Sequence, residues 1–487
     1  MSSDDAISTK EMQATKVVKP EADQASGSHD PKEDEASGSH FQPFEETQKL
    51  SIVIHGKPNT FGVTPERLES LKQAADQPAK PRIQRVPFML RENEDFKQYY
   101  EPRVVAIGPI HHGKSKIFDY SETIKHRLAG KFMEEHGIDV HVLYDKIMAN
   151  LEKLKLCYAE DVMKEKNYSD DELTWMFLVD GCSMLHFIDC IVKDDSKLEK
   201  LNIKKDQMAF AQQDMFLLEN QLPYELLELL MNSVVQITEK EAIKSSISSF
   251  ICNNLMTMKT SPGGKSGKNT LVTSGEEKPT CHLLELLRKE LINFKSDKAV
   301  RSDETHSFRN VKELIGSGIL LEPTGNTSLA ISFQQSCFTG TLKLPSLIVD
   351  DSTGPKFLNL IAYETCPDFM NDFQVTSYIC FLDSLIDHPE DVQELRKAKI
   401  LTNVLGSDKE VAELFNKIGK DLVPNPDLYV KVKDDMEKHY KSTWKSYTAE
   451  AYNTYFTSPW SFLALIGALL ALFFSAVQAY FSLPSEK

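Results

Sequence analysis

The feature that most constrains this sequence is a long uncharged run close to its C-terminal end. No Asp, Glu, Lys or Arg occurs over residues 451–485, and the stretch from Trp460 to Phe481 is almost entirely apolar. A helix needs about 20 apolar residues to cross about 30 Å of hydrocarbon. The run therefore predicts a transmembrane helix over residues 459–481, followed by a short tail over 482–487.

The side chains of this run indicate how such a helix would be held. Trp460 and Tyr480 lie near its two ends, where aromatic residues gather at membrane–water interfaces, and Gly467 lies inside it. We expect these three residues to belong to the membrane anchor. Small residues also recur at helical spacing. This predicts either a face that packs against a second copy of the helix, or only the general abundance of small residues in membrane helices. The residues of that face are Ala464, Ala468, Ala471, Ser475 and Ala479.

The two ends of the chain predict a topology. Residues 1–19 are polar and contain no apolar stretch of the kind that signal peptides carry. A span that follows the whole domain would then insert after synthesis, with the domain on the cytosolic side. Lys441 and Lys445 precede the run and Lys487 follows it, and this excess of positive charge also favours a cytosolic domain.

Composition excludes some classes of partner. The chain has 487 residues, enough for one large or two medium domains, and a formal net charge of −16. Because nucleic-acid binding without sequence preference relies on Lys and Arg, we expect no nucleic-acid partner. The eight cysteines are scattered without a CxxC pair, so we expect buried, reduced thiols. The familiar nucleotide-binding and zinc-binding motifs are missing from the sequence, so no cofactor or metal is expected.

The sequence divides into regions of different texture. Residues 1–80 are rich in charged and small polar residues, and we expect an acidic disordered tail and linker there. Residues 81–450 have the apolar periodicity of a globular domain, with a polar insert over 259–280. The pattern predicts an α+β fold that is predominantly α-helical with a small β element, plus the C-terminal membrane helix. Helices are predicted at Glu122–Glu135, Val142–Lys155, Asp171–Val192, Met208–Leu218, Tyr224–Val235, His282–Phe294, Phe357–Tyr363, Thr376–Ile386, Val392–Ile400, Asp408–Lys417 and Tyr429–Tyr447, and strands at Gly318–Pro323, Ala330–Phe333 and Leu342–Val349.

Two adjacent histidines are the most suggestive local cluster. His111 and His112 lie in a stretch bounded by Gly108, Pro109 and Gly113. Imidazoles on such a turn can hold a metal or move a proton. The alternative is a structural turn whose imidazoles hydrogen-bond the backbone, because neighbouring side chains diverge and the sequence places no third ligand beside them.

A second candidate cluster interrupts an apolar helix. Asp214 and Glu219 are carboxylates five residues apart, a pair of the kind that serves in acid–base catalysis. The alternative is that these residues hydrogen-bond and cap a break in the helix, with Asn220 near the cap and Pro223 at the start of the next helix.

Several of these stretches, in this order, resemble a known plant family. The similarity begins at residue 81 and continues to about residue 481, outside the acidic tail and the polar insert. The residues that carry the resemblance are Ile83–Pro87, Tyr100–Pro109 with His111–Gly113, Asp214–Pro223, Leu344–Pro345, Asp350–Thr353, Asn359–Glu364, Asn403–Gly406 and Ser458–Trp460. On these residues the chain is similar to the family named domain of unknown function 247, also called uncharacterised protein family 0481.

The resemblance implies a limited set of expectations. The family is plant-specific, with a C-terminal membrane helix and no assigned enzymatic activity, and some members are linked genetically to self-incompatibility and to floral sex determination. We therefore expect a single-pass plasma-membrane protein that acts by protein–protein recognition or signalling in reproduction, with an unidentified protein or a second copy of itself as partner. Two alternatives stay open. One is an enzyme whose site is assembled from His111, His112, Asp214 and Glu219, and the other is a structural scaffold on an internal membrane.

Overall fold

The computed structural model describes residues 81–113, 118–258, 280–294, 309–336, 339–369, 372–441 and 459–482, with isolated positions at Thr64, Pro65 and Glu69. Contacts separate Met1–Asp76 from Gln77–Lys487, and the named helices and strands all belong to the second unit. The tail expected over residues 1–80 and the polar insert expected over residues 259–280 lie almost wholly outside the described residues.

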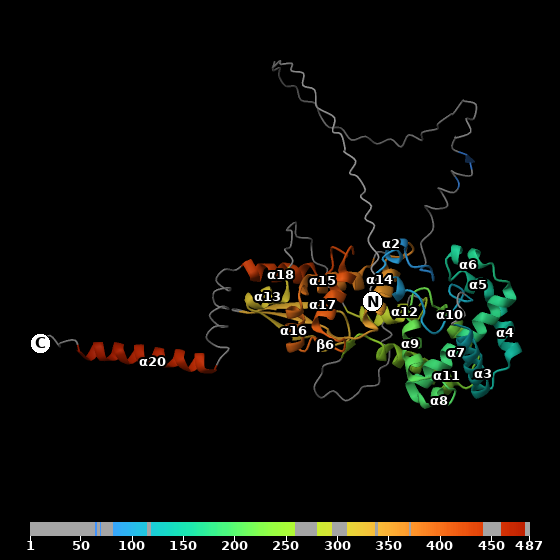
Figure 1. Cartoon of the computed structure of the whole chain (residues 1–487), viewed down its shortest axis with the longest axis horizontal. Helices are drawn as coiled ribbons and strands as arrows, with labels where there is room; N and C mark the ends of the chain where they lie inside the picture. Colours follow the sequence, from blue (N-terminus) through green and yellow to red (C-terminus); the bar gives the residue numbers. More distant parts are fainter. Residues whose placement is uncertain are drawn as a thin grey trace, which may run out of the picture. The chain divides into compact units, whose positions relative to one another are not determined.

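The first half of the domain is helical and is built around α7 (Asp170–Lys193) (Figure 1). Ser169 and Glu172 form a capping box at the start of this helix, and most of its 24 residues are buried. The helix predicted at Asp171–Val192 is thereby confirmed. The other helices of this half are α2 (Phe88–Arg91), the 3-10 helix η1 (Lys97–Tyr99), α3 (Phe118–His136), α4 (Val140–Ala149), α5 (Leu151–Lys155), α6 (Glu160–Lys166), α8 (Ser196–Glu199), α9 (Lys205–Asp214), α10 (Tyr224–Met231) and α11 (Ile237–Asn253).

The helices of this half differ from the predictions most clearly at three places. The helix predicted over Val142–Lys155 is divided at Asn150 into α4 and α5. The helix predicted to reach Leu218 ends at Asp214. Helix α11 was not predicted, because serines interrupt an apolar face that includes Ile243, Ile247 and Phe250. All three differences arise from polar residues that break or obscure the apolar period.

The second half combines helices with two small sheets. One sheet has the order β1-β5-β6, in which β5 is antiparallel to β1 and parallel to β6. The other has the order β2-β4-β3, in which β4 is parallel to β2 and antiparallel to β3. The elements of this half are β1 (Thr257–Met258), α12 (Leu283–Leu291), α13 (Val311–Gly316), β2 (Ile319–Pro323), β3 (Ser332–Gln335), β4 (Gly340–Leu344), β5 (Ser346–Val349), α14 (Thr353–Glu364), α15 (Gln374–Leu385), α16 (Pro389–Lys397), β6 (Leu401–Asn403), α17 (Asp408–Gly419) and α18 (Val430–Lys441).

The prediction of one strand over Leu342–Val349 was wrong. Pro345 separates β4 from β5, and the two strands belong to different sheets. Proline has no N–H to donate to a ladder, so the chain leaves one sheet at this point and enters the other. The helix predicted to reach Ile400 likewise ends at Lys397 and is followed by β6. The α-rich fold with a small β content is nevertheless as predicted.

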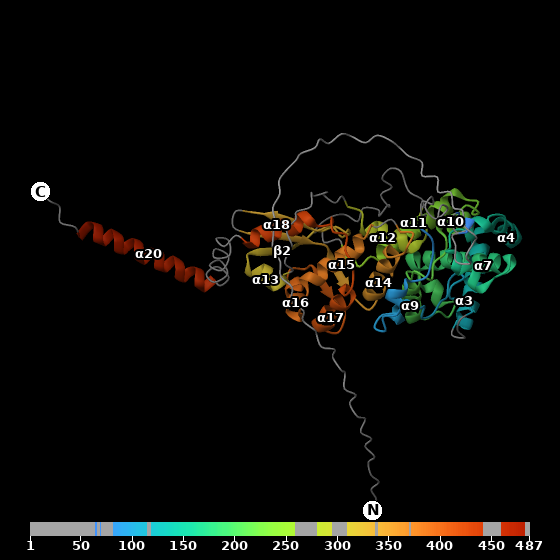
Figure 2. The same ribbon diagram turned by 90° about the horizontal axis from the view of Figure 1, so that it is seen from above.

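The two halves are joined through α14, which lies between them in both views (Figures 1 and 2). All twelve residues of α14 are buried. Asn359 on this helix accepts a hydrogen bond from the backbone N–H of Leu218 at 2.8 Å and donates one to the carbonyl of Tyr99. Strand β1, which follows the helical half in sequence, pairs with β5. The helical half and the mixed half therefore share one continuous core.

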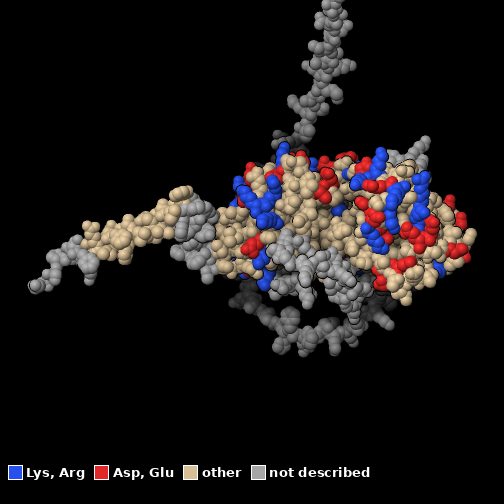
Figure 3. Space-filling model, turned by 90° about the horizontal axis from the view of Figure 1, so that it is seen from below, with Lys and Arg blue, Asp and Glu red and all other residues tan. Residues whose placement is uncertain are grey.

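The last described element is α20 (Pro459–Ser482), a helix of 24 residues. The described part of it carries no charged atom (Figure 3). Among the described helices, only α7 is long and apolar enough by length and composition to cross a membrane, and 78% of its most apolar window is buried inside the protein. Within the described side chains, the apolar stretch of α20 is Leu463–Gln478, which is shorter than α7.

Seven of the eight cysteines lie in the described residues, and all seven are free thiols. Cys182, Cys190 and Cys366 are buried, and burial raises the pKa of Cys182 to about 12. The expected reduced state is confirmed for these seven, whereas full burial is found for three of them. Cys337 lies outside the described residues.

Candidate functional site

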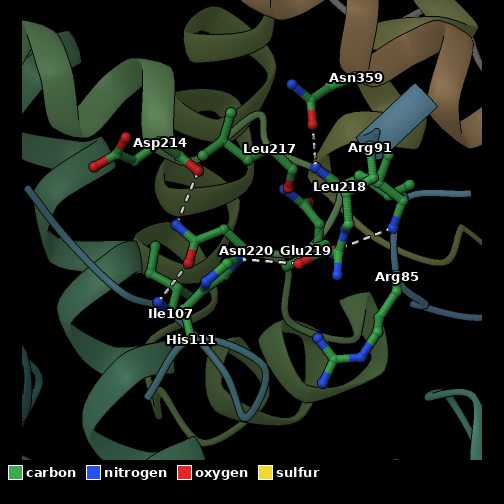
Figure 4. Close-up of polar contacts among 12 residues, drawn as sticks. Arg85, Arg91, Ile107, His111, Asp214, Leu217, Leu218, Glu219, Asn220 and Asn359 are labelled. Atoms are coloured by element: carbon green, nitrogen blue, oxygen red, sulfur yellow. Dashed lines mark hydrogen bonds and ion pairs between the residues drawn. The ribbon is translucent and has the colours of Figure 1, made fainter. Parts of the chain in front are cut away.

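A buried polar network joins segments that lie far apart in sequence (Figure 4). Asp214, the last residue of α9, accepts hydrogen bonds from the backbone N–H groups of Arg103, Val104 and Val105 at 2.8–2.9 Å. Burial raises the pKa of Asp214 to about 6, although the three N–H donors and Arg103 act in the opposite direction. The Asp214 carboxyl group is therefore occupied in holding residues 103–108, which we call the 103–108 loop.

Asn220 holds the same loop from the other side. Its side-chain oxygen accepts the N–H of Ile107 at 2.7 Å, and its amide group donates to the carbonyls of Val105 and Asp214. Gly108 ends the loop with a φ of +69°, and a Cβ at this position would lie 2.9 Å from the carbonyl oxygen of Gln221. Only glycine fits both the backbone conformation and the available space.

Glu219 is the centre of a second part of the network. His111 Nε2 lies 3.3 Å from one of its carboxylate oxygens, and the other oxygen accepts the N–H of Val86 at 2.8 Å. Arg91 of α2 forms an ion pair with the same carboxylate, whereas Arg85 points away and pairs with Glu165 (Figure 4). His111 and Glu219 are almost fully buried, which fits a bridge between elements better than an open reaction site.

The structure brings together only two of the four residues that were candidates for catalysis. His111 meets Glu219, but Asp214 accepts from the 103–108 loop, and His112 Nδ1 lies 3.9 Å from Glu122. The helix break expected between Asp214 and Pro223 is present. No group of three or more His, Cys, Asp or Glu able to hold a metal occurs within the described ranges.

A buried ion pair next to the network was not predicted. Lys125 of α3 and Asp180 of α7 approach to 2.5 Å, and Asp180 also accepts the N–H of Gly108 at 2.8 Å. Lys125 donates further to the carbonyl of Ala106 and to Glu122. Burial acts to lower the pKa of Lys125, but Asp180 and Glu122 together raise it above its usual range. The only signal in the sequence was a charged residue within each of two apolar helical faces.

Two cavities border this ion pair, one at Lys125 and the other at Asp180. One has a volume of about 80 Å³ and is mostly apolar, with walls that include Val105, Lys125 and Met184. The other has a volume of about 190 Å³, and its walls include Asp180 and His112. Pockets that combine apolar walls with a few convergent polar groups are the usual form of ligand sites. The Lys125–Asp180 pair and the 103–108 loop thus form parts of the walls of these cavities.

Helix α20 has a different character from the rest of the molecule. Trp460 is 80% exposed, and a Cβ added at Gly467 would meet no atom within 4 Å. Four members of the small-residue face are exposed, whereas the side chains of Ala479 and Tyr480 lie outside the described residues. The four are Ala464, Ala468, Ala471 and Ser475.

Comparisons with known proteins agree with the resemblance seen in the sequence. Residues 83–474 match the family described as a plant protein of unknown function, domain of unknown function 247. The chain is 26% identical to UPF0481 protein At3g47200 of Arabidopsis thaliana over 418 residues, which covers 78% of this chain and 82% of that protein. It is 20% identical over 473 residues to Putative UPF0481 protein At3g02645 of the same plant, with 78% and 86% covered. No solved structure matches the chain. Because the match spans most of its length and includes the segments of the polar network, this protein belongs to the plant family known as domain of unknown function 247.

Proposed function

We propose that this chain is a single-pass membrane protein whose globular domain is held at a membrane surface by α20 and acts there by protein–protein recognition. The observation that carries the proposal is the exposure of apolar side chains around α20. At 1.5 Å per residue, a helix of 24 residues is about 36 Å long, which is enough to cross about 30 Å of hydrocarbon. Its exposed large residues include Leu463, Leu469, Leu470, Leu472, Phe473 and Phe474.

The free energy of this exposure supports a bilayer as the partner of α20. Burying one Leu or Phe side chain is worth about 1.5–3 kcal/mol. Six such side chains are each at least 50% exposed. Moving them from water into an apolar environment would release on the order of 10 kcal/mol of free energy. That is comparable to the whole stability of a typical domain.

Helix α7 is long and apolar enough to cross a membrane, but the protein itself already surrounds it. It carries Asp180 and His186 in its interior, and both have partners inside the protein. A span through α7 would require the helical half to unfold. We therefore assign the membrane-spanning role to α20 alone.

We propose that the globular domain faces the cytosol and that the membrane is the plasma membrane. The lysines that precede α20 support a domain on the cytosolic side, and the family resemblance suggests the plasma membrane and a recognition role in reproduction. Protease protection on sealed membrane vesicles tests the topology. We expect the globular domain to be digested without detergent, and its full protection would reverse the orientation.

Alkaline carbonate extraction tests the anchor directly. The full chain is expected in the membrane pellet, and a variant lacking residues 459–482 is expected in the supernatant with an unchanged far-ultraviolet helix signal per residue of the domain. Recovery of the intact chain in the supernatant would contradict the proposal. Retention of the deletion variant in the pellet would assign the membrane to another segment.

A surface on α2 supports the recognition part of the proposal. Phe88 and Met89 are 75% and 83% exposed, although Arg91 in the same short helix is fixed on the buried Glu219. Aromatic residues and Met are enriched in the cores of protein interfaces. A photo-crosslinking residue at position 89 is expected to give a discrete product in plant membranes, whereas the same residue at Val235, which is equally exposed, should give none. The same product from both positions would indicate nonspecific contact.

A further inference from the structure

The larger cavity beside the Lys125–Asp180 pair has the chemistry of a specific binding site. Its volume is about 190 Å³. The cavity lies between α3, α7 and the turn that contains His112.

Aromatic rings form much of its wall. Trp175 of α7 is 45% exposed, and its ring centroid lies 6.2 Å from that of His126 on α3. His112 and Tyr168 form a second pair, with centroids 6.1 Å apart and an interplanar angle of 71°. The faces of such rings attract cations, and Trp does so most strongly.

The polar atoms of the cavity are mainly acceptors. His126 Nδ1 lies 2.8 Å from the carbonyl oxygen of Glu122, so this nitrogen carries the proton and Nε2 of the neutral ring is an acceptor. His112 Nδ1 is buried 3.9 Å from the Glu122 carboxylate, without a hydrogen-bond partner in the described part of the chain. Glu172 accepts from Ser169 and forms no ion pair with any other described residue. A ligand that donates hydrogen bonds would satisfy these groups.

The charges of the described residues around the cavity leave one negative charge in excess. Glu122, Glu172 and Asp180 line it, and Lys125 is bonded to Glu122 and Asp180. All three donors of Lys125 are used, because it also bonds the carbonyl of Ala106. Among the residues that the structure describes, Lys166 is the other cation near the cavity, and it donates to the carbonyl of His112 with its Nζ 5.8 Å from the Tyr168 ring centroid. Three carboxylates therefore face two ammonium groups.

We infer that this cavity binds a small organic monocation, a protonated alkylamine, with the ammonium group donating to Glu122, Glu172 and the imidazole of His112 and its carbon chain against Trp175. The ammonium supplies both the missing charge and the missing donors. An anion would be repelled by the excess negative charge, and a neutral apolar molecule would leave the acceptors unpaired.

Trp175 gives a direct reporter of binding. The chain has three tryptophans, so replacing Trp444 and Trp460 by Phe leaves Trp175 as the only one. The full chain in an uncharged maltoside detergent is titrated with n-butylammonium chloride, with sodium chloride at equal ionic strength, and with n-butanol. We expect a saturable change in Trp175 emission with butylammonium, no saturation with sodium chloride, and binding of butanol at least about tenfold weaker.

A charge-removing variant that keeps the fold tests the assigned residues. Gln can replace Glu172 in the capping box of α7, so Glu172→Gln is expected to melt close to the parent while binding butylammonium about tenfold more weakly. Glu413→Gln on α17, in the other half of the domain, is the matched control and should bind as the parent does. The inference is overturned by an absence of saturation with butylammonium, by equal binding of butanol, or by unchanged affinity in Glu172→Gln.

Discussion

Helices α7 and α20 have the same length, 24 residues, and both are rich in apolar residues, yet the protein treats them in opposite ways. Neighbouring helices surround α7 and bury most of it, whereas the described side chains of α20 are mostly exposed. The difference lies in their polar residues. Helix α7 carries charged residues at both ends and Asp180 within it, and α20 carries no charged residue.

Apolar content alone does not decide whether a long helix is buried in a folded domain. Each polar group of α7 needs a partner, and the fold provides one: Lys125 for Asp180, and Cys190 for His186. Such groups are costly in lipid, where no partner comes from outside. Helix α20 has no charged side chain that needs a partner, and a helix satisfies its own backbone hydrogen bonds, so it can lie in lipid without a folded core around it.

A charge placed in each helix gives the largest expected difference. Leu178 of α7 is fully buried, so Leu178→Asp introduces an unpaired buried charge that costs several kcal/mol and is expected to prevent folding. Leu470→Asp in α20 should leave the melting of the domain unchanged but reduce recovery in the carbonate-resistant pellet. Circular dichroism and membrane extraction on the same samples separate the two effects. Loss of folding in Leu470→Asp would show that α20 packs on the domain.

Breaking the buried ion pair gives the next effect. Asp180→Ala leaves Lys125 buried without its partner and removes the acceptor for Gly108, so we expect about 3–5 kcal/mol lower stability in chemical unfolding. The double variant Lys125→Met, Asp180→Leu removes both charges and should lose distinctly less. Equal losses in the two proteins would mean that the hydrogen bond to Gly108, rather than the charge, is what matters.

The pH dependence of stability tests the environment of Asp214. Its pKa in the folded state, about 6, lies above the usual 3.8, so its contribution to stability is full below pH 3.8 and is lost as the pH rises through 6. The free energy of unfolding should fall by on the order of 2–3 kcal/mol from this group between these values, and Asp214→Asn should lack that fall. Membrane extraction should not change over the same range, because α20 contains no group that titrates there. A wild-type profile parallel to that of Asp214→Asn would place the pKa elsewhere.

Replacing a glycine by alanine gives the smallest expected effect, and the same substitution can be made in both helices. A Cβ at Gly181 of α7 would lie 2.4 Å from Leu230, so Gly181→Ala is expected to cost about 1–3 kcal/mol through overpacking. A Cβ at Gly467 of α20 meets nothing, so Gly467→Ala should not destabilise the chain. If Gly467→Ala instead weakens crosslinking between two copies, the small-residue face forms a helix–helix contact.

Sequence periodicity predicted α7 and the α-rich fold because those features depend on local patterns. It failed at Pro345, where one apolar stretch serves two sheets, and at Asn150, where a single polar residue divides a helix. Partners far apart in sequence were out of reach: nothing in the sequence places Lys125 next to Asp180. His111 and Glu219 were recognised as unusual, but their meeting depends on how α2 and the turn fold back.

The 103–108 loop has a consequence for how the chain acquires its structure. Its amide hydrogens are held by side chains rather than by a neighbouring strand, and one of these side chains comes from a residue 111 positions further along the chain. Slow exchange of those amides with solvent therefore requires that α9 has already formed and that residues 103 and 214 have come together. Closing such a long loop costs conformational entropy and is therefore slow. Protection of the loop should thus arise late in refolding, after that of α7.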